Sequence, residues 1–179
     1  MSQIKLLSGD MTKIPVDAIV NAAHNSLMGG GGIDGVIHRT AGPELLNECL
    51  TLGGCETGEV KVTKGYNLPC KYIIHTVGPI WDINELWNPI YANMVKEIFS
   101  NQLRNCYFNS MLKANELLCE SISFPNISTG NYGFPKYLAA DIAISEINKW
   151  LELKTGSIKT VNFVCYDEEN YNIYFNLLK

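Results

Sequence analysis

Residues 16–35 read VDAIVNAAHNSLMGGGGIDG, in which a short apolar run is followed by a polar spacer and four successive glycines. The apolar run predicts a strand at 18–22, and the residues after Gly32 predict a helix at 33–40. Glycines let the backbone approach a ligand closely, and the free N–H groups at a helix start carry partial positive charge. This order is typical of a phosphate-binding loop, although a flexible turn is the alternative for a glycine run taken alone.

Short apolar runs alternate with longer helical patterns along the rest of the chain, with no repeat, linker or low-complexity stretch. We expect strands at 4–7, 18–22, 60–63, 72–77, 121–124 and 161–165. We expect helices at 33–40, 43–52, 90–118, 135–153 and from about residue 168 onward, with Pro43 and Pro135 in first helical turns. Strands interleaved with helices favour an α/β fold, and the continuous apolar runs indicate strands covered on both faces. The expected architecture is one domain over residues 1–179, with a central mixed sheet flanked by helices.

The composition excludes several classes of protein. The chain has 179 residues, 46% of them hydrophobic and 18% charged, as in an ordinary globular domain. Its 14 basic and 18 acidic side chains give a formal net charge of -4, which argues against binding nucleic acid by neutralising its phosphates. No stretch has the form of a signal peptide or a membrane span, so we expect no membrane partner and a cytoplasmic location. The six cysteines form no CxxC pair and have no histidine at zinc-ligand spacing, so we expect no metal and no cofactor.

A second glycine-bearing loop, residues 128–135, reads STGNYGFP and lies between the expected strand at 121–124 and the expected helix at 135–153. Its hydroxyl groups can donate to a phosphate or a sugar, and its tyrosine offers a flat wall for a sugar or a base. Neither glycine loop contains Lys or Arg. A diphosphate bound between them would therefore be neutralised by backbone amides and helix ends.

Two known phosphate motifs match the first loop only in part. The loop lacks the Lys-Ser or Lys-Thr pair of a nucleotide-hydrolysing P-loop. Gly30, Gly32 and Gly35 fit the dinucleotide fingerprint, but a spacer separates them from the end of the strand. Glu56, at the distance of a ribose partner, lies in a predicted turn and not at a strand end. A nicotinamide-dependent oxidoreductase stays as an alternative, which NAD binding and hydride transfer would support.

Several motifs along the chain resemble the macrodomain family, specifically its MacroD-type branch. They are Gly9-Asp10-Met11-Thr12, residues 16–23, residues 29–35, Ile37-His38-Arg39-Thr40-Ala41-Gly42, Ile74-His75-Thr76-Val77-Gly78-Pro79 and residues 127–135. The resemblance implies a three-layer α/β/α fold with a central mixed sheet of six or seven strands. It also implies ADP-ribose binding, removal of mono-ADP-ribose from acidic side chains and deacetylation of O-acetyl-ADP-ribose. The expected partners are ADP-ribose and mono-ADP-ribosylated proteins, and we expect a monomer.

The resemblance assigns contacts with the ligand to particular residues. It implies that Asp10 accepts from the adenine amino group, that the Met11 N–H faces the ring, and that Tyr166 stacks on adenine. The residues alone favour other interpretations, namely a turn carboxylate for Asp10 and a strand-end aromatic for Tyr166. The remaining implied contacts, to the diphosphate and the distal ribose, are Asn21, Asn25, Gly30, Gly31, Gly32, Ile33, Ser128, Thr129, Gly130, Asn131 and Tyr132.

Asp34 is the residue to which the resemblance assigns the chemistry. It implies that Asp34 orients the distal ribose and a water held by a substrate phosphate, and that this water attacks the anomeric carbon. The leaving group is already a carboxylate, so positioning could supply much of the rate. The alternative is an N-cap aspartate that satisfies helix N–H groups. His38, four residues later on the same helix face, is either a supporting hydrogen-bond partner or a packed histidine. For His75, on the expected strand at 72–77, we favour a structural role.

One departure from the family pattern affects the expected activity. His24 stands where family members have an asparagine that binds the distal ribose, and it joins Asp34 as a candidate catalytic residue. Neutral imidazole can donate and accept, whereas protonated imidazole only donates, so we expect activity to fall as His24 gains a proton. Asn25 could substitute for the missing amide after a small register shift. The chain is therefore either a hydrolase or a module that binds ADP-ribose without cleaving it.

Two further departures are smaller. Asn131 stands where the family more often has an aliphatic residue, and the segment between residues 81 and 106 is longer than in the family. We expect that longer segment to enlarge a helix or a loop away from the ligand.

Overall fold

A computed structural model describes residues 3–82, 89–153 and 156–179 of the chain. A six-stranded sheet forms the centre of the molecule, in the order β1-β6-β5-β2-β4-β3. The strands are β1 (Gln3–Ser8), β2 (Ala18–Ala22), β3 (Val60–Lys64), β4 (Tyr72–Thr76), β5 (Ser121–Phe124) and β6 (Thr160–Cys165). Five strands are parallel to one another, and the edge strand β3 runs antiparallel to β4. The expected mixed sheet is confirmed.

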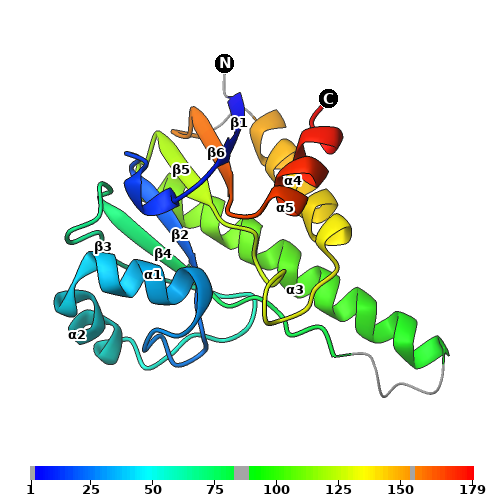
Figure 1. Ribbon diagram of the computed structural model, residues 1–179, viewed down its shortest axis with the longest axis horizontal. Coiled ribbons are helices and arrows are strands. Elements are labelled where there is room, and N and C mark those ends of the chain that lie inside the picture. The colour runs from blue at the N-terminus through cyan, green and yellow to red at the C-terminus, as the bar shows by residue number, and fades with distance from the viewer. Residues whose placement is uncertain (1–2, 83–88, 154–155) are drawn as a thin grey trace.

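Helices cover both faces of this sheet. They are α1 (Gly32–Ala41), α2 (Pro43–Thr51), α3 (Pro89–Glu116), α4 (Lys136–Glu152) and α5 (Glu168–Leu177), and a short 3-10 helix, η1, spans Met11–Lys13. Figure 1 shows α1 and α2 on one face of the sheet and α3, α4 and α5 on the other. The three-layer α/β/α fold is confirmed. The ends of the elements lie within two residues of the predicted ends, and β2 and β5 match them at both ends; Pro135 is the N-cap of α4 instead of its first helical residue.

Each face of the sheet has its own hydrophobic core. Ile19 of β2 packs with the helices α1 and α2, whereas Ala18 and Val20 of the same strand pack with α3 and α4. All three side chains are fully buried. A central parallel strand is apolar on both faces because helices cover both, which is why the run at 18–22 lacks the alternation of a half-exposed strand.

The longer segment between residues 81 and 106 includes residues 83–88, which lie outside the described residues, and the first half of α3. That half of α3 extends beyond the edge of the sheet layer (Figure 1). Its exposed apolar side chains are Ile90, Tyr91, Met94 and Ile98. Within the described ranges, α3 included, no helix has the length and apolarity needed to cross a membrane.

Candidate functional site

A cavity of about 790 Å³ lies where the five parallel strands end. Its wall includes Gly9 after β1, Ala23 after β2, Gly78 after β4, Pro125 after β5 and Tyr166 after β6. Carboxyl ends of parallel strands meet at one edge of a sheet, where the following loops leave a crevice. A cavity of this volume is within the range of small-molecule and cofactor sites.

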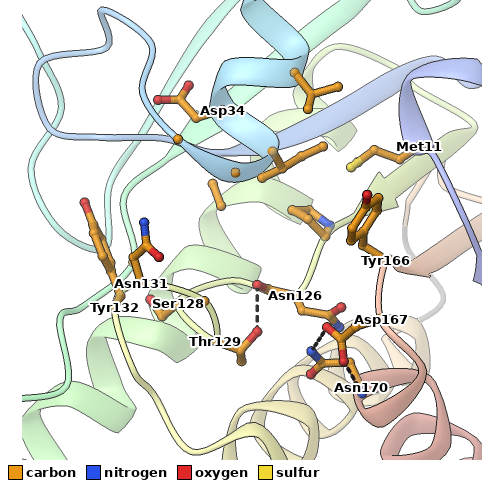
Figure 2. Close-up of a pocket in the computed structure, with 18 of the residues that line it drawn as sticks. Met11, Asp34, Asn126, Ser128, Thr129, Asn131, Tyr132, Tyr166, Asp167 and Asn170 are labelled. Carbon is orange, nitrogen blue, oxygen red and sulfur yellow. Dashed lines mark hydrogen bonds between the residues drawn. The ribbon is translucent and has the colours of Figure 1, made fainter.

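Most of the residues singled out in the sequence line this cavity. They are Asp10, Met11, His24, Gly30, Gly31, Gly32, Ile33, Asp34, Ser128, Thr129, Gly130, Asn131, Tyr132 and Tyr166. Asn21 and Asn25 are not among the lining residues. Figure 2 shows Asp34 and Tyr132 at one end of the cavity and Met11 and Tyr166 at the other. These residues come from five separate segments of the sequence and form one site.

The two glycine loops approach each other across the cavity. A Cβ atom placed on Gly31 would lie 3.7 Å from Nδ2 of Asn131, so the loops are within van der Waals reach at this point. Behind the second loop, a Cβ on Gly78 would lie only 2.0 Å from Oγ of Ser128. A side chain at position 78 would force Ser128 and Ile127 to shift, and Ser128 itself adopts a φ of 65°. The position of the second loop therefore depends on the strand end at β4.

Both helices that begin at these loops have free N-termini. The N-cap of α1 is Gly31, and the N-cap of α4 is Pro135; neither makes a side-chain capping hydrogen bond. The first residues of α1 line the cavity and no side chain caps their N–H groups, which is the arrangement that binds anions. Asp34 is the third residue of α1, so the N-cap interpretation of this carboxylate is wrong.

The carboxylate of Asp34 is buried and fixed, although it borders the cavity. Asp34 is only 3% exposed. The side-chain amide of Asn21 donates to Oδ1 at 2.7 Å, and the backbone N–H of His24 donates to Oδ2 at 3.4 Å. Tyr132 lies at the same end of the cavity, and burial together with the negative charge of Asp34 raises the pKa of its hydroxyl. The site thus presents an oriented carboxylate beside an anion-binding helix start.

His38 supports this end of the cavity from behind the first glycine loop. Its Nε2 lies 3.5 Å from Oδ1 of Asp34, within ion-pair distance, but forms no hydrogen bond within the described part of the chain. A Cβ on Gly29 would lie 3.2 Å from Cγ of the His38 ring. His38 therefore acts mainly as a packed histidine that lies against the first glycine loop, with its Nε2 close to Asp34.

The structure corrects two expectations about amides near the ribose end. Asn21 is fully buried behind Asp34, so it supports the carboxylate and does not line the cavity. Asn25 donates its side-chain amide to the carbonyl of Cys55 at 3.0 Å, which turns it away from the position that His24 leaves. The register shift that would let Asn25 replace the missing amide is absent.

The side chain of His24 is exposed and bonds within its own loop. Its Nδ1 lies 3.1 Å from Oγ of Ser26 and accepts the Ser26 N–H at 3.3 Å. Only the backbone N–H of His24 contacts Asp34. Any residue except proline can make that contact at position 24, so the histidine side chain is not required to hold the carboxylate.

The opposite end of the cavity is more open. Tyr166 is 89% exposed, while Met11 forms the buried floor beside it. Asp10 caps η1 by accepting from the Thr12 hydroxyl at 2.6 Å and the Thr12 N–H at 3.0 Å, and these bonds lower the pKa of its carboxyl group. The turn-carboxylate interpretation of Asp10 is confirmed, and the same side chain borders the cavity.

Sequence reasoning missed a polar group of side chains on the α4 and α5 side of the cavity. Lys136 begins α4, and its Nζ lies 3.4 Å from Oδ1 of Asp167, which caps α5 through the N–H of Asn170 at 2.9 Å. All three residues line the cavity. Asn126, between β5 and the second loop, lines it as well. The available signal was position, because each residue follows a predicted strand or begins a predicted helix.

Within residues 3–82, 89–153 and 156–179, no group of three His, Cys, Asp or Glu side chains could hold a metal ion. Burial raises the pKa of the Cys49 and Cys55 thiols to about 11, and these cysteines are free. Such thiols are protonated near neutral pH and are poor nucleophiles.

Comparison with known protein families gives a match to the family described as Macro domain over residues 20–143. A macro domain-containing protein of Methanosarcina mazei is 48% identical over 95% of this chain and 84% of its own length. The human ADP-ribose glycohydrolase MACROD2 is 45% identical over 96% of this chain, which spans 38% of that longer protein.

Solved structures give the same result. The Oceanobacillus iheyensis macrodomain with ADP superposes with a TM-score of 0.87 at 41% identity and covers 99% of this chain and 90% of its own. The Trypanosoma brucei macrodomain in complex with ADP-ribose has a TM-score of 0.86 at 41% identity, with 98% of this chain and 69% of its own covered. Sequence and structure therefore agree on one family.

Proposed function

The chain belongs to the macrodomain family, and from this premise we propose that it binds ADP-ribose and hydrolyses the bond that joins mono-ADP-ribose to acidic residues of proteins. The observation that carries the proposal is the buried Asp34 carboxylate beside the uncapped N-terminus of α1. Support comes from the relatives, one of which is named an ADP-ribose glycohydrolase and one of which holds ADP-ribose.

The diphosphate of the ligand fits between the two glycine loops. Backbone N–H groups at the start of α1 face this space, and each helix end stabilises an anion by about 0.3–1 kcal/mol at an exposed site. Ser128 and Thr129 line the opposite side of the cavity, where the Thr129 hydroxyl donates to the carbonyl of Asn126 at 3.2 Å. The adenine ring then extends toward Met11 and Tyr166, where an exposed aromatic ring can stack on it. An acidic protein binds a dianionic ligand in this way with few basic side chains.

This placement brings the distal ribose to Asp34. We propose that the carboxylate accepts hydrogen bonds from the ribose and from a water, and so aligns the water with the anomeric carbon. A bond forms between the water oxygen and the anomeric carbon as the bond between that carbon and the carboxylate of the modified target protein breaks. The carboxylate of the modified target protein leaves with the bonding electrons, and the proton of the water passes to a phosphate oxygen of the substrate. Orientation of bound reactants supplies much of the rate in such a step.

A target protein mono-ADP-ribosylated on glutamate or aspartate tests the proposal. We expect the wild-type protein to release free ADP-ribose and the Asp34→Ala variant to bind ADP-ribose without releasing it. Tight binding by the wild type with no release would show a binding module instead of an enzyme, and binding of NAD more tightly than ADP-ribose would contradict both.

O-acetyl-ADP-ribose is a second substrate that the same geometry supports. Its acetyl ester lies on the distal ribose, which this placement brings beside Asp34. Release of acetate that disappears in Asp34→Ala would support this activity, and slow release equal in both proteins would contradict it.

A further inference from the structure

A row of buried polar side chains crosses three neighbouring strands beneath α1. Thr63 lies on β3, His75 on β4 and Asn21 on β2, and none of them is more than 2% exposed. Oγ1 of Thr63 lies 2.8 Å from Nε2 of His75, and Nδ1 of His75 lies 3.1 Å from Nδ2 of Asn21. Nδ2 of Asn21 then lies 2.7 Å from Oδ1 of Asp34. The row connects the edge strand of the sheet with the carboxylate at the cavity.

These contacts determine where the protons of the row lie. An amide nitrogen only donates, so Nδ2 of Asn21 gives one hydrogen to Asp34 and the other to Nδ1 of His75. Nδ1 of His75 is therefore the unprotonated nitrogen, and the Nε2–H of the ring donates to Thr63. Burial, together with the nearby His38, lowers the pKa of His75 to about 3, so this ring is neutral in ordinary buffers.

The orientation of the Asn21 amide depends on these two N–H bonds. Its carbonyl oxygen, Oδ1, is buried and has no hydrogen-bond partner within the described part of the chain. If the amide turned over, Oδ1 would face the carboxylate oxygen of Asp34, and two acceptors at that distance repel each other. An unprotonated Nδ1 on His75 prevents this, because it accepts only from the amide nitrogen.

We propose that Thr63 and His75 are positioning residues for Asp34 and that they act through Asn21. The Thr63 hydroxyl accepts from Nε2 of His75 and so satisfies the buried N–H of the tautomer whose Nδ1 accepts from Asn21; without that acceptor the buried N–H is unpaired and this tautomer is disfavoured. That tautomer selects the orientation of the Asn21 amide, and the amide fixes the carboxylate of Asp34 toward the cavity. The effect on turnover rests on the proposed function, whereas the ring tautomer is a property of the ligand-free protein.

Substitutions at Thr63 test the row at a residue that does not line the cavity. Thr63→Val keeps the shape of the side chain and removes the acceptor, and Thr63→Ser restores it. Thr76→Val is the matched control, because Thr76 is a fully buried threonine on β4 whose hydroxyl donates to the carbonyl of Glu59 at 2.8 Å, outside the row. Both valine variants lose one buried hydroxyl, but only Thr63→Val removes a hydrogen bond to His75.

We expect Thr63→Val to lower kcat by up to about ten-fold, the range for loss of one hydrogen bond between neutral groups, while the Kd for ADP-ribose stays unchanged. Thr63→Ser and Thr76→Val should keep the wild-type kcat, although Thr76→Val should lower the melting temperature. An equal fall of kcat in both valine variants, or no fall in Thr63→Val, would overturn the proposal.

Nitrogen-15 NMR of the histidine rings gives a second readout that needs no turnover. In the ligand-free wild type we expect His75 to carry its proton on Nε2, and in Thr63→Val we expect part of that proton population to move to Nδ1. A wild-type His75 protonated on Nδ1, or the same tautomer in both proteins, would overturn the proposal. If the wild type releases no ADP-ribose, the proposed function fails, and this measurement still decides whether the row selects the tautomer.

Discussion

The two ends of the cavity hold their side chains in different ways. Asp34, at one end, is 3% exposed and accepts a hydrogen bond from Asn21 at 2.7 Å. Tyr166, at the other end, is 89% exposed and projects from the loop between β6 and α5 (Figure 2). A buried, hydrogen-bonded group keeps one geometry before the ligand arrives, whereas an exposed ring on a loop adjusts to it. Under the proposed function, the Asp34 end serves chemistry and the Tyr166 end serves affinity.

The largest expected effect is at the buried end. Asp34→Ala should lower kcat by about 10²-fold or more, the order expected when one preorganised electrostatic group is removed. The Kd for ADP-ribose should change much less, because the glycine loops and Tyr166 remain. Single-turnover release of ADP-ribose and calorimetric binding measure the two quantities. Asp34→Asn is the matched control because it keeps the shape of the side chain and removes its charge. If Kd weakened by the same factor as kcat fell, the division between the two ends would be contradicted.

A substitution behind the first glycine loop should affect both ends together. A Cβ on Gly35 would lie 2.3 Å from the backbone oxygen of Gly30 and 3.0 Å from Nη1 of Arg39. Gly35→Ala must therefore displace the loop that faces the diphosphate, and overpacking of this kind costs about 1–3 kcal/mol. We expect a weaker Kd for ADP-ribose, a lower kcat and a lower melting temperature. Unchanged binding would show that the loop does not contact the ligand.

At the exposed end, Tyr166→Ala tests the contribution of stacking. Loss of one base-stacking ring costs about 1–3 kcal/mol, so the Kd for ADP-ribose should weaken by roughly 5- to 150-fold. The kcat at saturating substrate should stay the same, and the free energy of unfolding should change little because the ring is exposed. Tyr166→Phe keeps the ring and should bind as the wild type does. A fall of kcat in Tyr166→Ala would contradict the proposed division.

His75, which lies in the buried row behind Asp34, should make the free energy of unfolding depend on pH. Burial and the nearby His38 lower the pKa of His75 from its ordinary value of 6.5 to about 3. Between these two values the unfolded chain binds a proton that the folded chain does not, so the free energy of unfolding falls as pH falls below about 6.5. The slope approaches about 1.4 kcal/mol per pH unit for one such group. Urea unfolding between neutral pH and pH ~5, above the usual carboxylate range, measures it. A flat profile there would contradict a buried neutral His75.

The smallest expected effect concerns the residue that departs from the family pattern. The side chain of His24 bonds to Ser26, and its contact with Asp34 is through the backbone N–H. His24→Asn should therefore change kcat only a few-fold at neutral pH, the scale of one exposed hydrogen bond. If protonation of the ring lowers activity, the asparagine variant should have a flatter pH profile on the acid side. Identical profiles in the two proteins would exclude His24 from the chemistry.

Much of the fold could be predicted because its signals are local. The continuous apolar run at 18–22 indicates a strand buried on both faces, and Gly42 followed by Pro43 separates α1 from α2. The short helix η1 was missed because its three residues have no periodicity and are defined by the cap from Asp10. Local patterns thus predict long elements and not single turns.

The candidate site was predictable only where its residues lie in the loops themselves. The burial of Asn21 behind Asp34 depends on the pairing of Asn21 with His75 across β2 and β4, which no local pattern gives. Lys136 and Asp167 come from different segments and meet only because α4 and α5 begin on the same side of the sheet. Contacts between distant segments depend on strand order and register, which one sequence does not specify.

A structure of the protein with ADP-ribose bound tests the central claim most directly, which is that the uncapped start of α1 and the two glycine loops hold the diphosphate and bring the distal ribose to Asp34. The expected density places the diphosphate between residues 30–32 and residues 128–132, with the adenine beside Tyr166 and the anomeric carbon facing Asp34. Density for the ligand at another surface, or a reversed orientation with the adenine at Asp34, would contradict the claim.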